Sequence, residues 1–116
     1  MRHPERVEDY LKHISEAIDR ATEYLRPLAD LEAFQENRQV QDAVVRNIEI
    51  IGEAVNKIQR IAPDFIKRHP ELPWAEMRGM RNVAIHEYFF IDLPIVWMTV
   101  RRDLPALKQQ IDALLM

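Results

Sequence analysis

Apolar residues recur at alternating spacings of three and four along most of the chain, the pattern of amphipathic helices. The first stripe covers residues 4–29, with Pro4 in the first turn and Arg26-Pro27 marking a kink or fraying near the end. A second helix is predicted over residues 37–61, because Pro63 ends it. The buried face of this second helix is expected to consist of Val40, Val44, Ile48, Ile51, Val55 and Ile58.

The second half of the chain begins with three prolines within residues 62–73, which predict a short helical turn and a connector. A third helix is predicted over residues 74–88, and Asp92 suits the N-cap of a fourth that reaches Leu114. Pro105 lacks an amide donor, so this last helix is expected to kink near residues 101–103 or to split into two stacked segments. The pattern predicts one all-α domain over residues 1–116, a four- to five-helix up-and-down bundle.

Apolar positions on the second helix extend beyond one face, since Val45 and Ile50 lie beside the main stripe. A chain of 116 residues has little room to bury so much apolar surface internally. Exposed apolar area of this kind usually marks an interface, and a homodimer through helix surfaces is therefore predicted.

Composition narrows the class of protein. The absence of cysteine excludes disulfides and thiolate metal sites. The N-terminus lacks the apolar core of a signal peptide, and no apolar run approaches the roughly 20 residues of a membrane span, so a soluble cytoplasmic protein is expected. The four histidines show no paired spacing, and neither a metal nor another cofactor is predicted. A net charge of −3 argues against broad nucleic-acid coating but leaves room for a local basic cleft.

The candidate chemistry is concentrated in residues 81–88, where an arginine, a histidine and a tyrosine interrupt an apolar segment. A permanent cation and a group that titrates near neutral pH suit phosphodiester chemistry. On a regular helix Arg78, Asn82 and His86 share one ridge, whereas Arg81 and His86 lie about 140° apart. Either the helix ends before His86, or another surface, such as the same motif of a second subunit, completes the site.

Each of these residues also has an ordinary explanation. A histidine at a helix end often bonds a carbonyl, an arginine among glutamates is usually a solvated ion pair, and Tyr88 fits a half-buried aromatic position. The clustering of Arg78, Arg81, Asn82 and His86 on one apolar helix favours a functional site over these separate explanations.

The motif Arg81-Asn82-x-x-x-His86-x-Tyr88 resembles that of the HEPN superfamily, and in particular the HepT-like toxins of type VII toxin–antitoxin pairs. The block Arg46-Asn47-x-Glu49-Ile50-Ile51-Gly52-Glu53-Ala54 is similar to another distinctive block of that family, and the likeness continues through Val96-Trp97 and Asp103-Leu104-Pro105. The resemblance implies a dimer that joins two motifs in one cleft and cleaves RNA without a metal. It also implies a partner nucleotidyltransferase antitoxin that attaches AMP to the motif tyrosine, here Tyr88.

Metal-free RNA cleavage would give each residue of the motif a role. Arg81 is expected to stabilise charge on the phosphorane, His86 to move a proton, and Asn82 to orient the phosphate or the imidazole. Glu53 and Glu49 are candidates to pair with an arginine of the motif, with a solvated helix face as an equally open alternative. Arg78, Arg101 and Arg102 are candidate RNA contacts from charge alone.

The competing hypothesis is a non-catalytic helical adaptor that binds a nucleotidyltransferase or a nucleotide. The acidic net charge and the apolar helix faces favour it. A titratable group beside a guanidinium disfavours it, because a scaffold has no need of that pair. Loss of toxicity on substitution of His86 would separate the two hypotheses.

Overall fold

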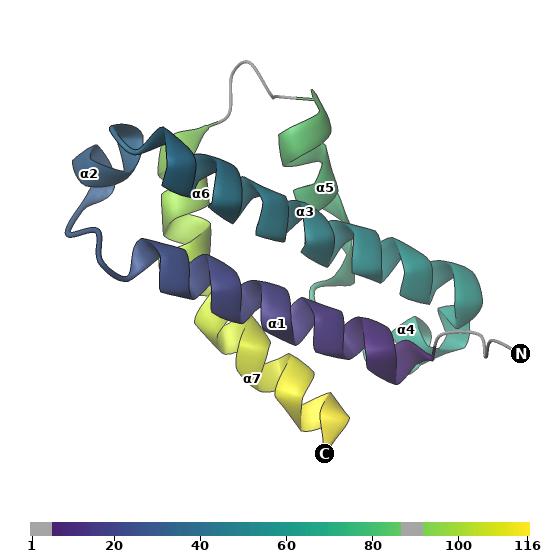
Figure 1. The fold of residues 1–116 in the computed structure, drawn as a ribbon. Coiled ribbons are helices and arrows are strands. Elements are labelled where there is room, and N and C mark those ends of the chain that lie inside the picture. The colour runs from purple at the N-terminus through teal and green to yellow at the C-terminus, as the bar shows by residue number, and fades with distance from the viewer. Residues whose placement is uncertain (1–5, 87–91) are drawn as a thin grey trace, which may run out of the picture.

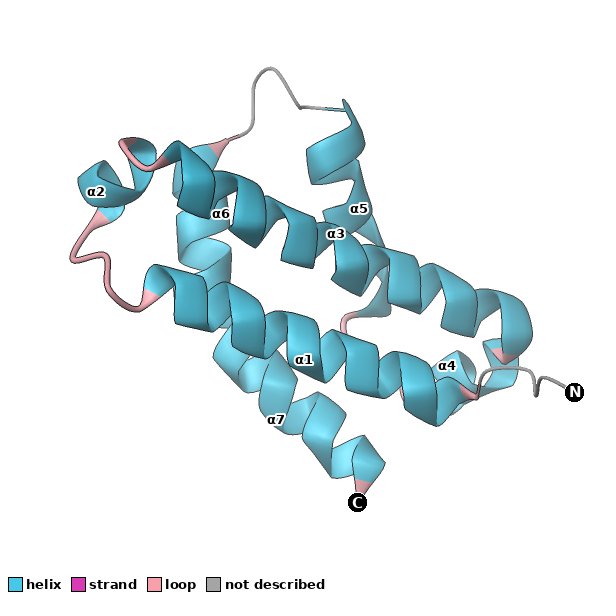
Figure 2. Ribbon diagram, viewed as in Figure 1, coloured by secondary structure: helices cyan, strands magenta, loops and turns pink. Residues whose placement is uncertain are grey.

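The computed structural model describes residues 6–86 and 92–116, with residues 82–86 described by their backbone alone. Within these ranges the chain forms helices, loops and turns and no strand (Figure 2), which confirms the all-α prediction. No helix in this part of the chain is both long and apolar enough to cross a membrane.

Two long antiparallel helices form the centre of the fold (Figure 1). Helix α1 (Val7–Leu25) packs along α3 (Arg38–Ile61). Helix α5 (Trp74–His86) also packs against α3. The C-terminal helix α7 (Leu104–Leu115) lies against α1. The helix over residues 37–61 is thus confirmed, while the first helix ends at Leu25, just before the Arg26-Pro27 pair.

Two short helices flank α3, and the first of them was not predicted. Helix α2 (Leu31–Gln35) begins at Asp30, whose side chain accepts a hydrogen bond from the Ala33 amide at 2.9 Å. Its single fully buried residue, Phe34, packs against Trp97 with ring centroids 5.8 Å apart. Helix α4 (Pro63–Arg68) is the predicted short helical turn. One buried side chain in five residues gives no helical periodicity, which explains why the pattern of apolar residues missed α2.

The last predicted helix is divided, as Pro105 led us to expect. Helix α6 (Leu93–Met98) starts at the predicted cap, where Asp92 accepts from the Ile95 amide at 3.1 Å. A π-helix, η1 (Thr99–Asp103), then joins α6 to α7. The amide of Leu104 donates to the carbonyl of Thr99, five residues earlier, just before the proline that has no amide to donate. The described chain therefore has more helices than the four to five predicted.

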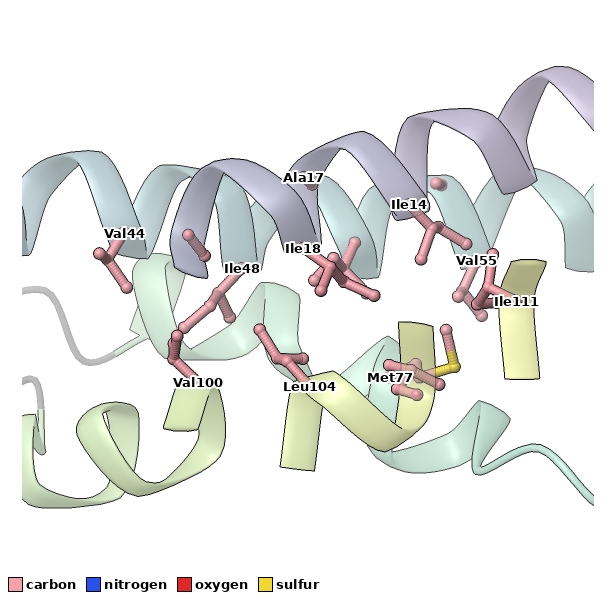
Figure 3. Packing of buried hydrophobic residues seen from close by; sticks show 14 of the residues in the cluster. Ile14, Ala17, Ile18, Val44, Ile48, Val55, Met77, Val100, Leu104 and Ile111 are labelled. Atoms are coloured by element: carbon pink, nitrogen blue, oxygen red, sulfur yellow. The ribbon is translucent and has the colours of Figure 1, made fainter. Parts of the chain in front are cut away.

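The core lies between α1, α3 and α7, with α5 closing one side (Figure 3). Apolar side chains with almost no exposure fill it from all of these helices. They include Ile14 and Ile18 from α1, Val44, Ile48 and Val55 from α3, Met77 from α5, and Leu104 and Ile111 from α7.

A polar cluster ties α7 to α1 beside this core. The hydroxyl of Ser15 donates to Oδ1 of Asp112 at 2.8 Å, and Nζ of Lys108 donates to the Ser15 hydroxyl at 2.7 Å. Lys108 also reaches Oδ2 of Asp112 at 2.9 Å and Asp19 at 3.4 Å. The hydrogen bond from Lys108, followed by that from Ser15, lowers the pKa of Asp112, and the bond to Asp112 raises the pKa of Lys108.

Because the pKa of Asp112 lies below its ordinary value of 3.8 in the folded protein, the unfolded chain binds that proton more readily. The carboxylate therefore stabilises the fold at neutral pH, and this contribution is lost as the pH falls through the lowered pKa. We expect Asp112→Asn to lower the free energy of unfolding at pH 7 by at most about 1 kcal/mol, because the side chain is half exposed. Urea denaturation at pH 7 and near pH 3 should show the difference from wild type shrinking in acid; a constant difference would contradict this role.

Candidate functional site

Helix α5 carries Arg81, Asn82 and His86 of the motif and is anchored through its N-terminal half. The Trp74 side chain is buried, and its Nε1–H donates to the carbonyl of His69 at 2.8 Å. Met77 is completely buried, and its amide donates to the carbonyl of Pro73 at 3.0 Å. These contacts hold the first turns of α5 in place and leave its last turns to be positioned by α3.

The contact with α3 is closest at Gly52. A Cβ atom built on Gly52 would lie 2.5 Å from the backbone nitrogen of Arg81 and 2.8 Å from the Arg81 Cβ. The two helix backbones therefore approach each other at the residue predicted to be the catalytic cation. The sequence places Gly52 within a block typical of the family, but nothing in the block alone indicates that Gly52 touches Arg81.

The two arginines of α5 differ in their surroundings. Arg78 is exposed, and its Nη1 lies 3.5 Å from Oε1 of Gln59 on α3. Arg81 is also exposed, and its guanidinium has no ion-pair or hydrogen-bond partner within residues 6–81 and 92–116. An exposed guanidinium without a carboxylate beside it keeps its full charge available for an anionic ligand.

Helix α5 continues through His86, so the helix does not end before the histidine. The explanation in which the helix ends before His86 is therefore excluded, and on this helix Arg81 and His86 lie about 140° apart. Asn82 and His86 are placed by their backbone on this helix, on the ridge that begins at Arg78. Tyr88 lies outside the described residues.

Within the described chain, the two glutamates of α3 lie beside Arg46 of their own helix. Oε1 of Glu49 lies 2.6 Å from Nη1 of Arg46, and Oε1 of Glu53 lies 3.8 Å from the same atom. Glu53 also lines a cavity of about 220 Å³ between α1 and α3, together with Tyr10, His13, Ile50, Ala54 and Lys57. In the described part of the chain no ion pair or hydrogen bond joins either glutamate to Arg78 or Arg81.

Asn47 is a buried polar residue at the centre of α3 that sequence reasoning gave no role. Its amide nitrogen donates to the carbonyl of Ala43 at 2.8 Å, and its Oδ1 has no partner in the described structure. A buried acceptor of this kind costs free energy unless something donates to it. No three His, Asp or Glu side chains gather as a metal site would require in the same part of the structure.

Comparison with known proteins gives the class of this chain. The family model described as Ribonuclease HepT-like matches residues 14–114. The chain is 43% identical over 106 residues to "Probable ribonuclease HepT" of Thermococcus cleftensis, covering 91% of this chain and 93% of that protein. It is 37% identical to "Putative RNase MJ1380" of Methanocaldococcus jannaschii, with 91% and 94% covered. No solved structure gives a significant match.

These matches cover nearly the whole chain and exceed what chance similarity produces. The protein belongs to the HepT-like ribonuclease family of the HEPN superfamily. The resemblance drawn from the motif of α5 and from the block around Gly52 is thereby confirmed at the level of the family.

Proposed function

We propose that this protein is the toxin of a toxin–antitoxin pair and cleaves RNA without a metal ion, in a cleft formed by two copies of the motif. The observation that carries the proposal is the exposed guanidinium of Arg81, which has no hydrogen-bond or ion-pair partner within residues 6–81 and 92–116, on a helix that continues through His86. The names of the relatives, which describe ribonucleases, support RNA as the substrate.

The geometry of α5 supports a dimer. Arg81 and His86 lie about 140° apart on one helix, so a phosphate that contacts both needs groups from a second motif. Exposed apolar side chains on α6, the helix that follows the motif in the sequence, support such an interface. Ile95 and Met98 on α6 are 61% and 48% exposed and lie one helical turn apart, within the chain segment that follows the motif.

The chemistry uses the nucleophile that RNA itself supplies. One His86 removes the proton from the 2′-hydroxyl, whose oxygen attacks the adjacent phosphorus. The second His86 of the dimer protonates the departing 5′-oxygen, which leaves a 2′,3′-cyclic phosphate and a free 5′-hydroxyl. Arg81 stabilises the additional negative charge on the phosphorane, and Asn82 orients the phosphate or the imidazole through its amide.

The partner in this proposal is a nucleotidyltransferase that attaches AMP to Tyr88. The added phosphodiester brings a negative charge into a cleft whose cation, Arg81, has no carboxylate partner in the described structure. Binding of that phosphate to Arg81 would occupy the position that the RNA phosphate needs. Inhibition is therefore both steric and electrostatic.

The proposal is tested by expressing the wild type and His86→Ala without a partner and measuring growth and total RNA integrity. The wild type should arrest growth and degrade RNA, whereas His86→Ala should do neither, because it lacks the group that moves the proton. Far-UV circular dichroism and gel filtration should show that the variant keeps its helicity and its assembly.

Equal toxicity and equal RNA decay in the two proteins would remove the nuclease assignment. Absence of toxicity in both would favour the helical adaptor, for which the exposed apolar side chains of α6 would form part of the partner surface.

A further inference from the structure

We propose that Gly52 is a positioning residue for RNA cleavage, because its missing side chain sets the place of Arg81. The inference rests on the proposed function, in which Arg81 contacts the reacting phosphate. Its geometric basis is the close approach of α3 and α5 at these two residues.

The contact involves the backbone of α5. A Cβ atom on Gly52 would lie 2.5 Å from the nitrogen, 2.8 Å from the Cβ and 3.0 Å from the Cα of Arg81. None of these atoms can move away by rotation of a side chain. Any residue larger than glycine at position 52 must therefore displace α5 itself or bend α3.

A glycine at this position is costly for the helix that contains it. Position 52 lies in the middle of the 24 residues of α3, where glycine destabilises a helix relative to alanine. The residue is buried and its neighbours Ile51 and Ala54 are core residues, so the close approach to α5 is the feature that requires glycine here.

Arg81 depends on this contact because no hydrogen bond or ion pair of its own side chain fixes it within the described structure. Its guanidinium has no hydrogen-bond or ion-pair partner there, so its position follows from the backbone of α5. The first half of α5 is fixed by Trp74 and Met77. A larger residue at position 52 would thus push out the second half of the helix, which carries the motif.

The chain offers a matched control in its other glycine. Gly79 lies two residues before Arg81 on the same helix, is exposed, and has nothing within 4 Å of an added Cβ. Gly52→Ala and Gly79→Ala make the same chemical change, and only the first one alters the distance between α3 and α5.

The experiment measures RNA cleavage by the wild type, Gly52→Ala and Gly79→Ala as full-length chains. We expect Gly52→Ala to lose about 100-fold in kcat with a smaller change in KM, because a displacement near 1 Å misplaces a group that acts in the transition state. Gly79→Ala should stay within about twofold of the wild type, as exposed substitutions usually do.

A double-mutant cycle separates positioning from a general loss of folded protein. If Gly52 acts through Arg81, Gly52→Ala should cost much less in an Arg81→Lys background, where the guanidinium is already absent. A loss of folded protein would lower the activity equally in both backgrounds. An equal loss would therefore contradict the proposal.

The displacement is also measurable without activity. In the wild type and in Gly79→Ala, nuclear Overhauser contacts should link the α-protons of Gly52 to the amide and β-protons of Arg81. In Gly52→Ala the contacts between these two residues should weaken, while circular dichroism shows an unchanged helix content. Loss of helicity in Gly52→Ala would overturn the proposal, since it would make the role a structural one.

The outcomes distinguish this inference from the function on which it rests. A wild type that cleaves no RNA would end the proposed function and the inference together. A wild type that cleaves RNA beside a Gly52→Ala variant of equal activity would overturn the inference alone.

Discussion

Replacement of Arg81 by alanine is expected to lower kcat/KM for RNA cleavage by about 10³-fold, the usual scale for a cation that stabilises a phosphoryl transition state. The reason is that no other positively charged side chain lies at the contact with Gly52 in the described structure, so none replaces the guanidinium of Arg81 there. Arg81→Lys should recover only part of the activity, because an ammonium group lacks the two parallel donors of a guanidinium. Single-turnover cleavage of a defined RNA measures both variants.

Arg38→Ala is the control for the loss of one positive charge. Arg38 is exposed at the start of α3, and among the residues that the structure describes its one ion pair is with Asp42, at 3.9 Å. Its removal should leave cleavage within about twofold of the wild type. If Arg38→Ala lost as much activity as Arg81→Ala, the effect would be one of total charge, and Arg81 would have no special role.

Replacement of Tyr88 by phenylalanine is expected to abolish silencing by the nucleotidyltransferase while leaving the toxin active. Phenylalanine keeps the ring and removes the phenolic oxygen, which is the only atom of this side chain that can accept an AMP group. On co-expression, the wild type should gain the mass of attached AMP and lose its toxicity. Tyr88→Phe should keep its mass and continue to arrest growth.

Tyr24→Phe provides the comparison. Tyr24 lies on α1, and its side chain is 41% exposed. This variant should be modified and silenced like the wild type. A Tyr88→Phe protein that still acquired AMP and lost its toxicity would show that the acceptor is a different residue.

The helices were predictable where a long apolar stripe and a capping residue occur together. The stripe of α3, with Asn37 as its cap, and the start of α6 at Asp92 follow directly from residue type and spacing. Helix α2 was not predictable in this way, because one buried aromatic side chain, Phe34, holds it against Trp97, far along the chain. Such a contact depends on the tertiary structure and leaves no periodic trace in the sequence.

The candidate site shows the same division. The motif residues of α5 could be chosen from the sequence because their chemical types cluster. The contact that positions Arg81 could not be predicted from the sequence. It depends on which residue of α3 faces Arg81, and the presence of a glycine in α3 does not reveal that. The pairing of Glu49 and Glu53 was also open. Both were candidates for an arginine of the motif, and the structure shows them beside Arg46 of their own helix.

The π-helix between α6 and α7 affects the direction in which the buried residues of the C-terminal helices face. The buried residues Val96, Val100 and Leu104 are spaced four apart, and on a regular α-helix each such step advances the stripe by about 40° beyond a full turn. The wider turn of η1 takes up part of this drift, so Leu104, Leu107 and Ile111 still face α1. Gain or loss of one residue between Met98 and Leu104 would rotate α7 by about 100° and turn this apolar face away from the core.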